Sequence, residues 1–222
     1  MTSAERTVPA TAAGFVLAGG QSSRMGTDKA RVHLRGQPLI AVALGTLRSA
    51  GVTVSIAGAQ ADLAEFGNVI EDHGAGPLGG ICAALATIAN ETLAVFMPVD
   101  LPLMSPQLLH FMIRHAQITG APVTISSVNG FAQTFPAVID RSVLPKLEDE
   151  FRNGAGGCFA AFQHIAAELK RALSILPAEL LVQAGQVAHP EGLPASLWFL
   201  NVNRPVDVSR ASRILAAHRR VC

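Results

Sequence analysis

Short hydrophobic runs alternate along the chain with segments in which apolar residues recur every three or four positions. Short continuous runs bounded by Gly, Pro and polar residues predict buried strands, whereas the longer spacing predicts amphipathic helices. We therefore expect strands at Ala13 to Leu17, Val52 to Ala57, Asn68 to Ile70, Leu93 to Met97 and Val123 to Val128.

Two of the intervening helices have clear patterns. Pro38 to Ala50 places its apolar residues on one face, and a second helix begins at Ser105 and Pro106, which supply an N-cap and a proline near the first turn. The apolar faces comprise Leu39, Val42, Ala43 and Leu47 in the first helix and Leu108, Leu109, Met112 and Ile113 in the second. Strands and helices in alternation predict an α/β doubly wound, Rossmann-like fold: a mostly parallel sheet with helices on both faces.

The second half of the chain has a weaker pattern. We expect one strand at Thr134 to Ile139 and another at Trp198 to Val202, while residues 177–194 show little periodicity. Helical patterns cover Ser142 to Phe151, Phe159 to Leu169 and Val206 to His218. With 222 residues, half of them hydrophobic, the chain has material for one sizeable core, so we expect a single domain over residues 13–222.

The N-terminal segment and the charge balance exclude several classes of protein. Residues 1–12 lack an apolar core, so we expect a disordered tail, no signal peptide, no membrane span and a cytoplasmic protein. The net charge is +1, from 17 basic and 16 acidic side chains, and gives no field for nucleic acid. Three separated cysteines predict neither a disulfide framework nor a zinc ribbon.

Ligands of doubly wound folds bind beyond the carboxyl ends of the strands, so the residues after each apolar run are the informative ones. The first run leads into Leu17-Ala18-Gly19-Gly20-Gln21-Ser22-Ser23-Arg24-Met25-Gly26-Thr27-Asp28-Lys29. Gly19 and Gly20 allow backbone amides to approach phosphate oxygens, and Ser22 adds a hydroxyl donor. Arg24 and Lys29 can neutralise a triphosphate. The segment thus predicts a nucleotide-binding loop.

Two well-known phosphate loops do not fit this segment. The dinucleotide fingerprint requires G-x-G-x-x-G, and the P-loop requires G-x-x-x-x-G-K-[ST]. Here Gly20 and Gly26 enclose five residues and Thr27 follows. The histidines and cysteines form no arrangement for covalent catalysis either.

The loop resembles that of the molybdenum cofactor guanylyltransferases. The resemblance rests on the loop from Leu17 to Ala30 and on Gly76-Pro77-Leu78-Gly79-Gly80, Pro98-Val99-Asp100-Leu101-Pro102-Leu103, Phe135-Pro136-Ala137-Val138 and Asn201-Val202-Asn203-Arg204-Pro205-Val206-Asp207. It implies a Mg²⁺-dependent nucleotidyltransferase that transfers GMP from GTP to the terminal phosphate of the molybdenum cofactor. The products would be molybdopterin guanine dinucleotide and pyrophosphate, and molybdoenzymes or their chaperones would be further partners.

The resemblance also implies roles for individual residues. Asp100, at the end of a strand, would hold Mg²⁺, and Asp72 would contact the guanosine. Gly79, Gly80 and Asn203 would lie at the acceptor. The implied nucleotide site comprises Leu17, Ala18, Gly19, Gly20, Ser22, Lys29, Asp72 and Asp100, and the catalytic residues are Arg24, Lys29 and Asp100.

Several alternatives remain open from the sequence. Asp72 could be a turn residue, the glycines could form a plain loop before a helix, and Asn203 could cap the last helix. Gly58 stands near a position at which the family has an Asn that contacts the nucleotide. This difference leaves open transfer of a cytidylyl or other nucleotidyl group to the cofactor or to a sugar phosphate. A binding protein without turnover is a further alternative.

Overall fold

A seven-stranded sheet forms the centre of the protein. The computed structural model describes residues 12–19, 28–58, 61–72, 76–154 and 156–218. Across the sheet the strand order is β5-β4-β1-β6-β8-β7-β9. The strands are β1 (Ala12–Leu17), β4 (Thr53–Ala57), β5 (Val69–Ile70), β6 (Leu93–Pro98), β7 (Val123–Val128), β8 (Phe131–Asp140) and β9 (Ser174–Pro177). Only β8 runs antiparallel to its neighbours among these strands, so the expected mostly parallel sheet is confirmed.

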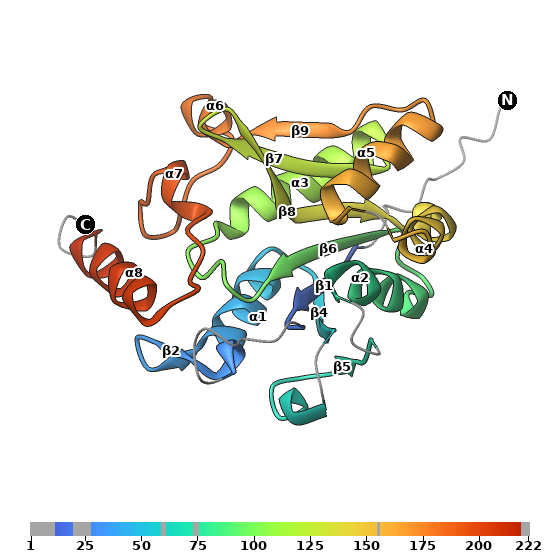
Figure 1. Ribbon diagram of the computed structural model, residues 1–222. Coiled ribbons are helices and arrows are strands. Elements are labelled where there is room, and N and C mark those ends of the chain that lie inside the picture. The colour runs from blue at the N-terminus through green and yellow to red at the C-terminus, as the bar shows by residue number, and fades with distance from the viewer. Residues whose placement is uncertain (1–11, 20–27, 59–60, 73–75, 155, 219–222) are drawn as a thin grey trace, which may run out of the picture.

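Helices cover both faces of the sheet, as the alternation of patterns predicted (Figure 1). One face packs against α1 (Leu39–Ser49), α3 (Pro106–Thr119), α7 (Ala195–Trp198) and α8 (Pro205–His218). The other packs against α2 (Gly76–Thr87), α4 (Leu144–Arg152) and α5 (Cys158–Glu168). Smaller elements are η1 (Lys29–Arg31), β2 (His33–Leu34), β3 (Gln37–Pro38), η2 (Ala61–Leu63), η3 (Arg141–Val143) and α6 (Ala178–Gln183).

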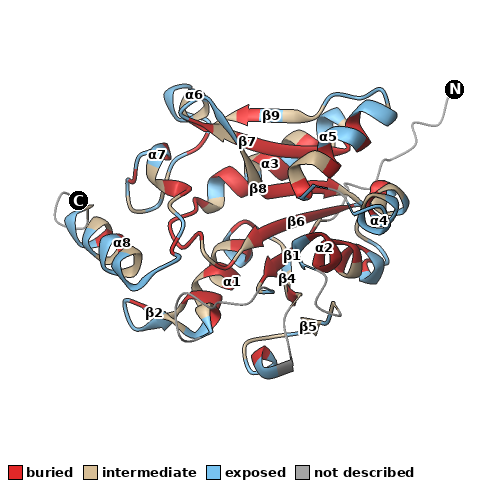
Figure 2. Ribbon diagram, viewed as in Figure 1, coloured by how far each residue is buried: buried red, intermediate tan, exposed pale blue. Residues whose placement is uncertain are grey.

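The central strand β1 contributes to both hydrophobic cores. Val16 faces the core with α1 and α3, whereas Phe15 and Leu17 face the core with α2. Phe15 stacks on Phe96 of the adjacent β6, with ring centroids 5.3 Å apart. Burial on both faces explains why the central strands read as continuous apolar runs, and Figure 2 shows these strands as buried along most of their length.

The structure differs from the predicted secondary structure at several places. Trp198 to Val202 is not a strand: Trp198 ends α7, and the residues after it cross the carboxyl edge of the sheet. The edge strand β9 was not predicted, because it is four residues long and its Ile175 is 44% exposed. The glycine-rich segment from Gly76 is not a loop before a helix but the first turns of α2 itself.

The predictions about the N-terminal tail and membrane spans concern residues that the structure describes only in part. The residues before Ala12 lie outside the described part, and Ala12 itself begins β1, one residue inside the expected tail. Within the described ranges, no helix has the length and apolar character needed to cross a membrane. Cys82 and Cys158 are buried free thiols.

Candidate nucleotide-binding and catalytic site

Four parallel strands end side by side at one edge of the sheet. The strands β5, β4, β1 and β6 are adjacent, and all four run in the same direction. Backbone hydrogen bonds continue past the strand ends from Ala18 N to Ala57 O (3.0 Å), from Gly58 N to Ile70 O (3.0 Å) and from Val99 N to Leu17 O (3.1 Å). The residues that follow these strands are thereby fixed relative to one another, and they include most of the predicted site.

Gly19 lies against the backbone that follows β4. A Cβ atom at Gly19 would lie 2.2 Å from the carbonyl oxygen of Gly58, which is far inside van der Waals contact. Because the obstacle is backbone rather than a flexible side chain, the position requires glycine. The predicted loop therefore begins with a residue that brings two strand ends into direct backbone contact.

Asp72 is held in a space that two glycines leave open. A Cβ atom at Gly58 would lie 3.2 Å from Asp72 Oδ2, and one at Gly80 would lie 3.4 Å from the same oxygen. Gly58 has φ +72°, a conformation that glycine adopts readily and that Asn tolerates better than most residues. Gly19, Gly58, Asp72 and Gly80 thus come together from four separate segments.

Two glycines of α2 are packed rather than open to solvent. Both Gly79 and Gly80 are buried in the first turns of the helix. Gly80 lies close to Gly58, since a Cβ atom on Gly80 would be 3.5 Å from the Gly58 Cα. The structure therefore gives these glycines a packing role, and their contact with an acceptor stays a prediction.

Lys29 and Asp100 form an ion pair across this edge. Lys29 Nζ lies 3.0 Å from Asp100 Oδ2, and the two side chains are only 18% and 17% exposed. Lys29 begins η1, whose N-terminus is capped by the Asp28 carboxylate accepting from Ala30 N at 3.0 Å. Lys29 also donates to Asn203 Oδ1 at 2.5 Å. Three residues widely separated in sequence therefore meet at one ammonium group.

Asp100 has a second carboxylate oxygen that is available for a ligand. Asp100 Oδ1 is buried and has no hydrogen-bond partner among the described residues. A buried carboxylate oxygen without a partner is energetically costly, so an oxygen-preferring cation would relieve it. No cluster of three or more acidic, His or Cys side chains that could hold a metal occurs in the described ranges. The donor set fits a cation that completes its coordination with phosphate and water.

Asn203 does not cap α8 with its side chain. That function belongs to Asp207, whose Oδ2 accepts from Arg204 N at 2.8 Å and from Asn203 N at 3.0 Å. The side chain of Asn203 is thereby free to accept from Lys29. Asp207 was not predicted as a cap, although an acidic side chain three positions after the residue that precedes a helix, here Arg204, is a known capping signal.

Three of the predicted site residues fall outside the described part of the chain. These are Gly20, Ser22 and Arg24, and their contacts with phosphate remain predictions. Seven other predicted residues are described and lie along the carboxyl edge of the sheet: Leu17, Ala18, Gly19, Lys29, Asp72, Asp100 and Asn203.

The two buried cysteines are poor nucleophiles. Burial raises the pKa of the Cys82 thiol to about 11, with a smaller contribution from Glu148. Burial likewise raises the pKa of Cys158 to about 11. At neutral pH both remain thiols, which agrees with chemistry that proceeds without a covalent enzyme intermediate.

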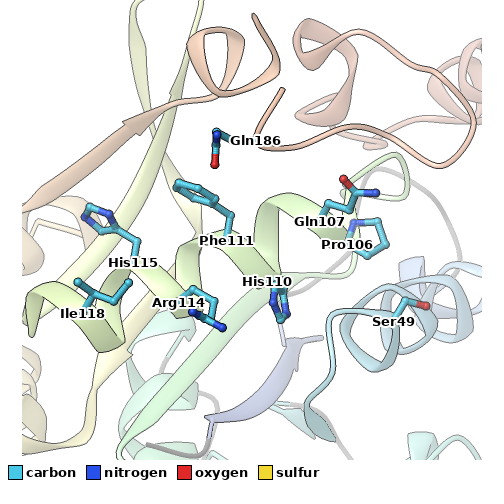
Figure 3. A pocket seen from close by; sticks show the side chains of 9 residues that line it. All are labelled: Ser49, Pro106, Gln107, His110, Phe111, Arg114, His115, Ile118 and Gln186. Carbon is cyan, nitrogen blue, oxygen red and sulfur yellow. The ribbon is translucent and has the colours of Figure 1, made fainter. Parts of the chain in front are cut away.

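A separate hollow lies on the outer face of α3. Its volume is about 530 Å³, and Figure 3 shows the α3 side chains along it, with Ser49 and Gln186 at its borders. None of the predicted site residues lines it. Its described lining has one arginine, two histidines and no carboxylate.

A mostly parallel sheet with glycines, a lysine and a carboxylate at its carboxyl edge defines the chain as a nucleotidyltransferase. Residues 14–171 match the family of the MobA-like NTP transferase domain, and the chain belongs to this family.

Individual relatives agree with this assignment. A molybdenum cofactor guanylyltransferase of Photobacterium profundum is 34% identical over 161 residues, covering 69% of this chain and 79% of the relative. One from Xanthomonas euvesicatoria is 42% identical over 105 residues, covering 47% of this chain and about half (54%) of the relative. The crystal structure of molybdopterin-guanine dinucleotide biosynthesis protein A from Archaeoglobus fulgidus superposes with a TM-score of 0.73 at 22% identity, covering 92% and 98% of the two chains, and supports the fold.

Proposed function

We propose that this protein transfers GMP from GTP to the terminal phosphate of the molybdenum cofactor, giving molybdopterin guanine dinucleotide and pyrophosphate. The observation that supports this most directly is the Lys29–Asp100 pair beside Gly19 and Asp72, with one oxygen of Asp100 left without a partner among the described residues. Two relatives are named molybdenum cofactor guanylyltransferase, which supports the same class of transfer here. We further propose a single-domain cytoplasmic enzyme that delivers its product to molybdoenzymes or their chaperones.

In this proposal the chain binds and orients two anionic substrates. The loop that starts at Gly19 and Gly20 surrounds the triphosphate, and Arg24 and Lys29 neutralise its charge. A phosphate oxygen of the acceptor attacks the α-phosphorus, and the bond from that phosphorus to the pyrophosphate oxygen breaks. No group on the protein must form a covalent bond, so positioning and charge neutralisation account for the catalysis.

Asp100 is the residue that we propose to hold a divalent cation, taken to be Mg²⁺. Its buried Oδ1 is the open donor, while Oδ2 is paired with Lys29. A bound Mg²⁺ would stabilise negative charge on the phosphate oxygens during transfer. Lys29, which contacts Asp100 Oδ2 and Asn203 Oδ1, would contribute its positive charge at the triphosphate.

Base selection is the part of the proposal for which this chain differs from its family. Asp72 Oδ2 lies over Gly58 and Gly80, and a carboxylate can accept the ring and exocyclic N–H groups that guanine presents. Gly58 offers no side chain near the position at which the family resemblance implies an Asn. Transfer from CTP to the same acceptor is therefore the second candidate.

The first test measures thermal stabilisation by GTP, CTP, ATP and UTP, each with and without Mg²⁺. A ligand that binds the native state raises its stability as RT ln(1 + [L]/Kd). We expect the largest Mg²⁺-dependent shift with GTP, followed by formation of the guanine dinucleotide when the cofactor is added. A larger shift in melting temperature with CTP would favour cytidylyl transfer instead. Nucleotide binding without formation of any product would contradict enzymatic activity.

Variants of the ion pair test the site. Lys29→Ala and Asp100→Ala should each lower turnover at least about a hundredfold, the scale of losing an electrostatic contact to the transition state. Lys146→Ala removes a lysine from an exposed ion pair with Glu168 and serves as the matched control, with near-normal turnover expected. Near-normal turnover of Lys29→Ala or Asp100→Ala would contradict the assignment.

A further inference from the structure

The turn before α8 connects the C-terminal helix to the ion pair at the sheet edge. Val202 is fully buried, and its N–H donates to the Asp100 carbonyl oxygen at 2.9 Å. The next residue, Asn203, accepts from Lys29 Nζ at 2.5 Å. One short turn thus contacts both members of the pair.

Packing alone does not fix Asn203, because the residue is exposed. Its orientation depends on the backbone hydrogen bonds on either side of it. On the N-terminal side this is the bond from Val202 to Asp100, and on the C-terminal side it is the Asp207 carboxylate, which accepts from both Asn203 N and Arg204 N. Asp207 is therefore the only described side chain that holds the Asn203 backbone.

Lys29 has a long side chain with several rotamers, so the position of its ammonium depends on its acceptors. Asp100 alone would draw Nζ onto its carboxylate, whereas Asn203 provides a second acceptor at the other side. We propose that Asp207 is a positioning residue for nucleotidyl transfer. It fixes the turn that presents Asn203 to Lys29, and through Asn203 it sets where the ammonium meets the triphosphate. This inference depends on the proposed function for its catalytic consequence.

A simple helix-capping role for Asp207 would affect stability but not Lys29. Asp140 provides a control of the same residue type, because as the N-cap of η3 its carboxylate accepts from Ser142 N at 2.8 Å. Asp140 pairs with Leu93, the first residue of β6, and therefore lies at the edge of the sheet opposite the site. Both substitutions remove an aspartate that accepts backbone N–H at a helix N-terminus, two groups for Asp207 and one for Asp140, but only Asp207 lies near Lys29.

The experiment has a kinetic part and a spectroscopic part. At saturating substrates, Asp207→Ala should lower kcat about tenfold, because a misplaced reacting group costs rate. Asp140→Ala should stay within about twofold, and Asp207→Asn, which keeps an acceptor oxygen, should recover most of the loss. In the free protein, the Cε–Hε NMR signal of Lys29, identified by its loss in Lys29→Arg, should shift in Asp207→Ala and not in Asp140→Ala.

Asn203→Ala completes a double-mutant cycle. If Asp207 acts through Asn203, then Asp207→Ala should have little further effect on kcat or on the Lys29 signal in an Asn203→Ala background. Additive losses, or an unchanged Lys29 signal in Asp207→Ala, would overturn the proposal. If the wild-type protein transfers no nucleotide, the proposed function fails, while the NMR cycle still decides whether Asp207 positions Lys29.

Discussion

Individual residues at the sheet edge are constrained by backbone as much as by charge. Gly19 touches the Gly58 carbonyl, and Gly58 and Gly80 leave space for the Asp72 carboxylate. The sequence predicted a phosphate contact for Gly19 and an acceptor contact for Gly80. The structure adds that each also permits a close approach between segments, and that at Gly19 an alanine would not fit without backbone movement.

Gly19→Ala tests this constraint. We expect the free energy of unfolding to fall by about 1–3 kcal/mol, because the methyl group would overlap the Gly58 oxygen. GTP affinity should fall as well. Urea unfolding and a nucleotide-binding titration measure the two effects.

The control is Gly45→Ala in α1, where a Cβ atom meets nothing within 4 Å. A helical glycine replaced by alanine should gain about 0.5–1 kcal/mol. If Gly19→Ala were as well tolerated as Gly45→Ala, the close approach described here would be incorrect.

At the scale of elements, the N-terminus of α3 connects the Asp100 segment to the C-terminal part of the chain. Ser105 is fully buried, and its hydroxyl accepts from Leu108 N and donates to the Ala188 carbonyl at 2.6 Å. Gln107 accepts from Ala188 N at 2.9 Å. The cap that the sequence predicted is therefore also a tertiary contact, which fixes the helix that follows Asp100.

Ser105→Ala should cost about 1–3 kcal/mol in unfolding free energy, because a cap is lost and the Ala188 carbonyl loses its hydroxyl donor. Ser209→Ala makes the same chemical change at an exposed hydroxyl of α8 and should stay within about 0.5 kcal/mol. Denaturant unfolding compares them. Equal effects of the two substitutions would mean that the contact to Ala188 contributes nothing.

At the scale of the whole molecule, His189 anchors the segment before α7 against Trp198 of that helix. Its ring lies beside Trp198, with centroids 6.2 Å apart, and its Nδ1 accepts from Glu191 N at 3.0 Å. Burial lowers the pKa of His189 below 6.5, opposed by the charge of Glu191 and a hydrogen bond with the Leu103 backbone and reinforced by His218. The neutral ring is the form that fits this site.

A lowered histidine pKa makes stability depend on pH in a defined direction. The unfolded chain takes up the proton more readily than the folded protein, so the contribution of His189 is fully present above pH 6.5 and is lost as the pH falls towards the folded pKa. We expect His189→Asn to reduce the slope of unfolding free energy between about pH 7.5 and 5.5. Because the substitution also removes the contact with Trp198, the slopes are compared rather than the stabilities. Equal slopes would contradict the prediction.

The sequence by itself determined the class of fold, the strands β1, β4, β5, β6 and β7, the capped α3 and the residues at the strand ends. These features are local: apolar runs, helical spacing and glycines next to charged residues are visible in one dimension. The family resemblance added Asp100 and Asp72 to the site, and it pointed to the Asn203 segment without revealing what Asn203 contacts.

Only the tertiary structure decided the features that depend on long-range contacts. The edge strand β9 exists because β7 pairs with it, and Trp198 to Val202 crosses the sheet edge because Val202 bonds to Asp100. The meeting of Lys29 with Asn203, 174 positions away, and the role of Asp207 behind it follow from the fold alone. Such contacts have no periodicity in the chain, since they arise where separate elements end at the same edge of the sheet.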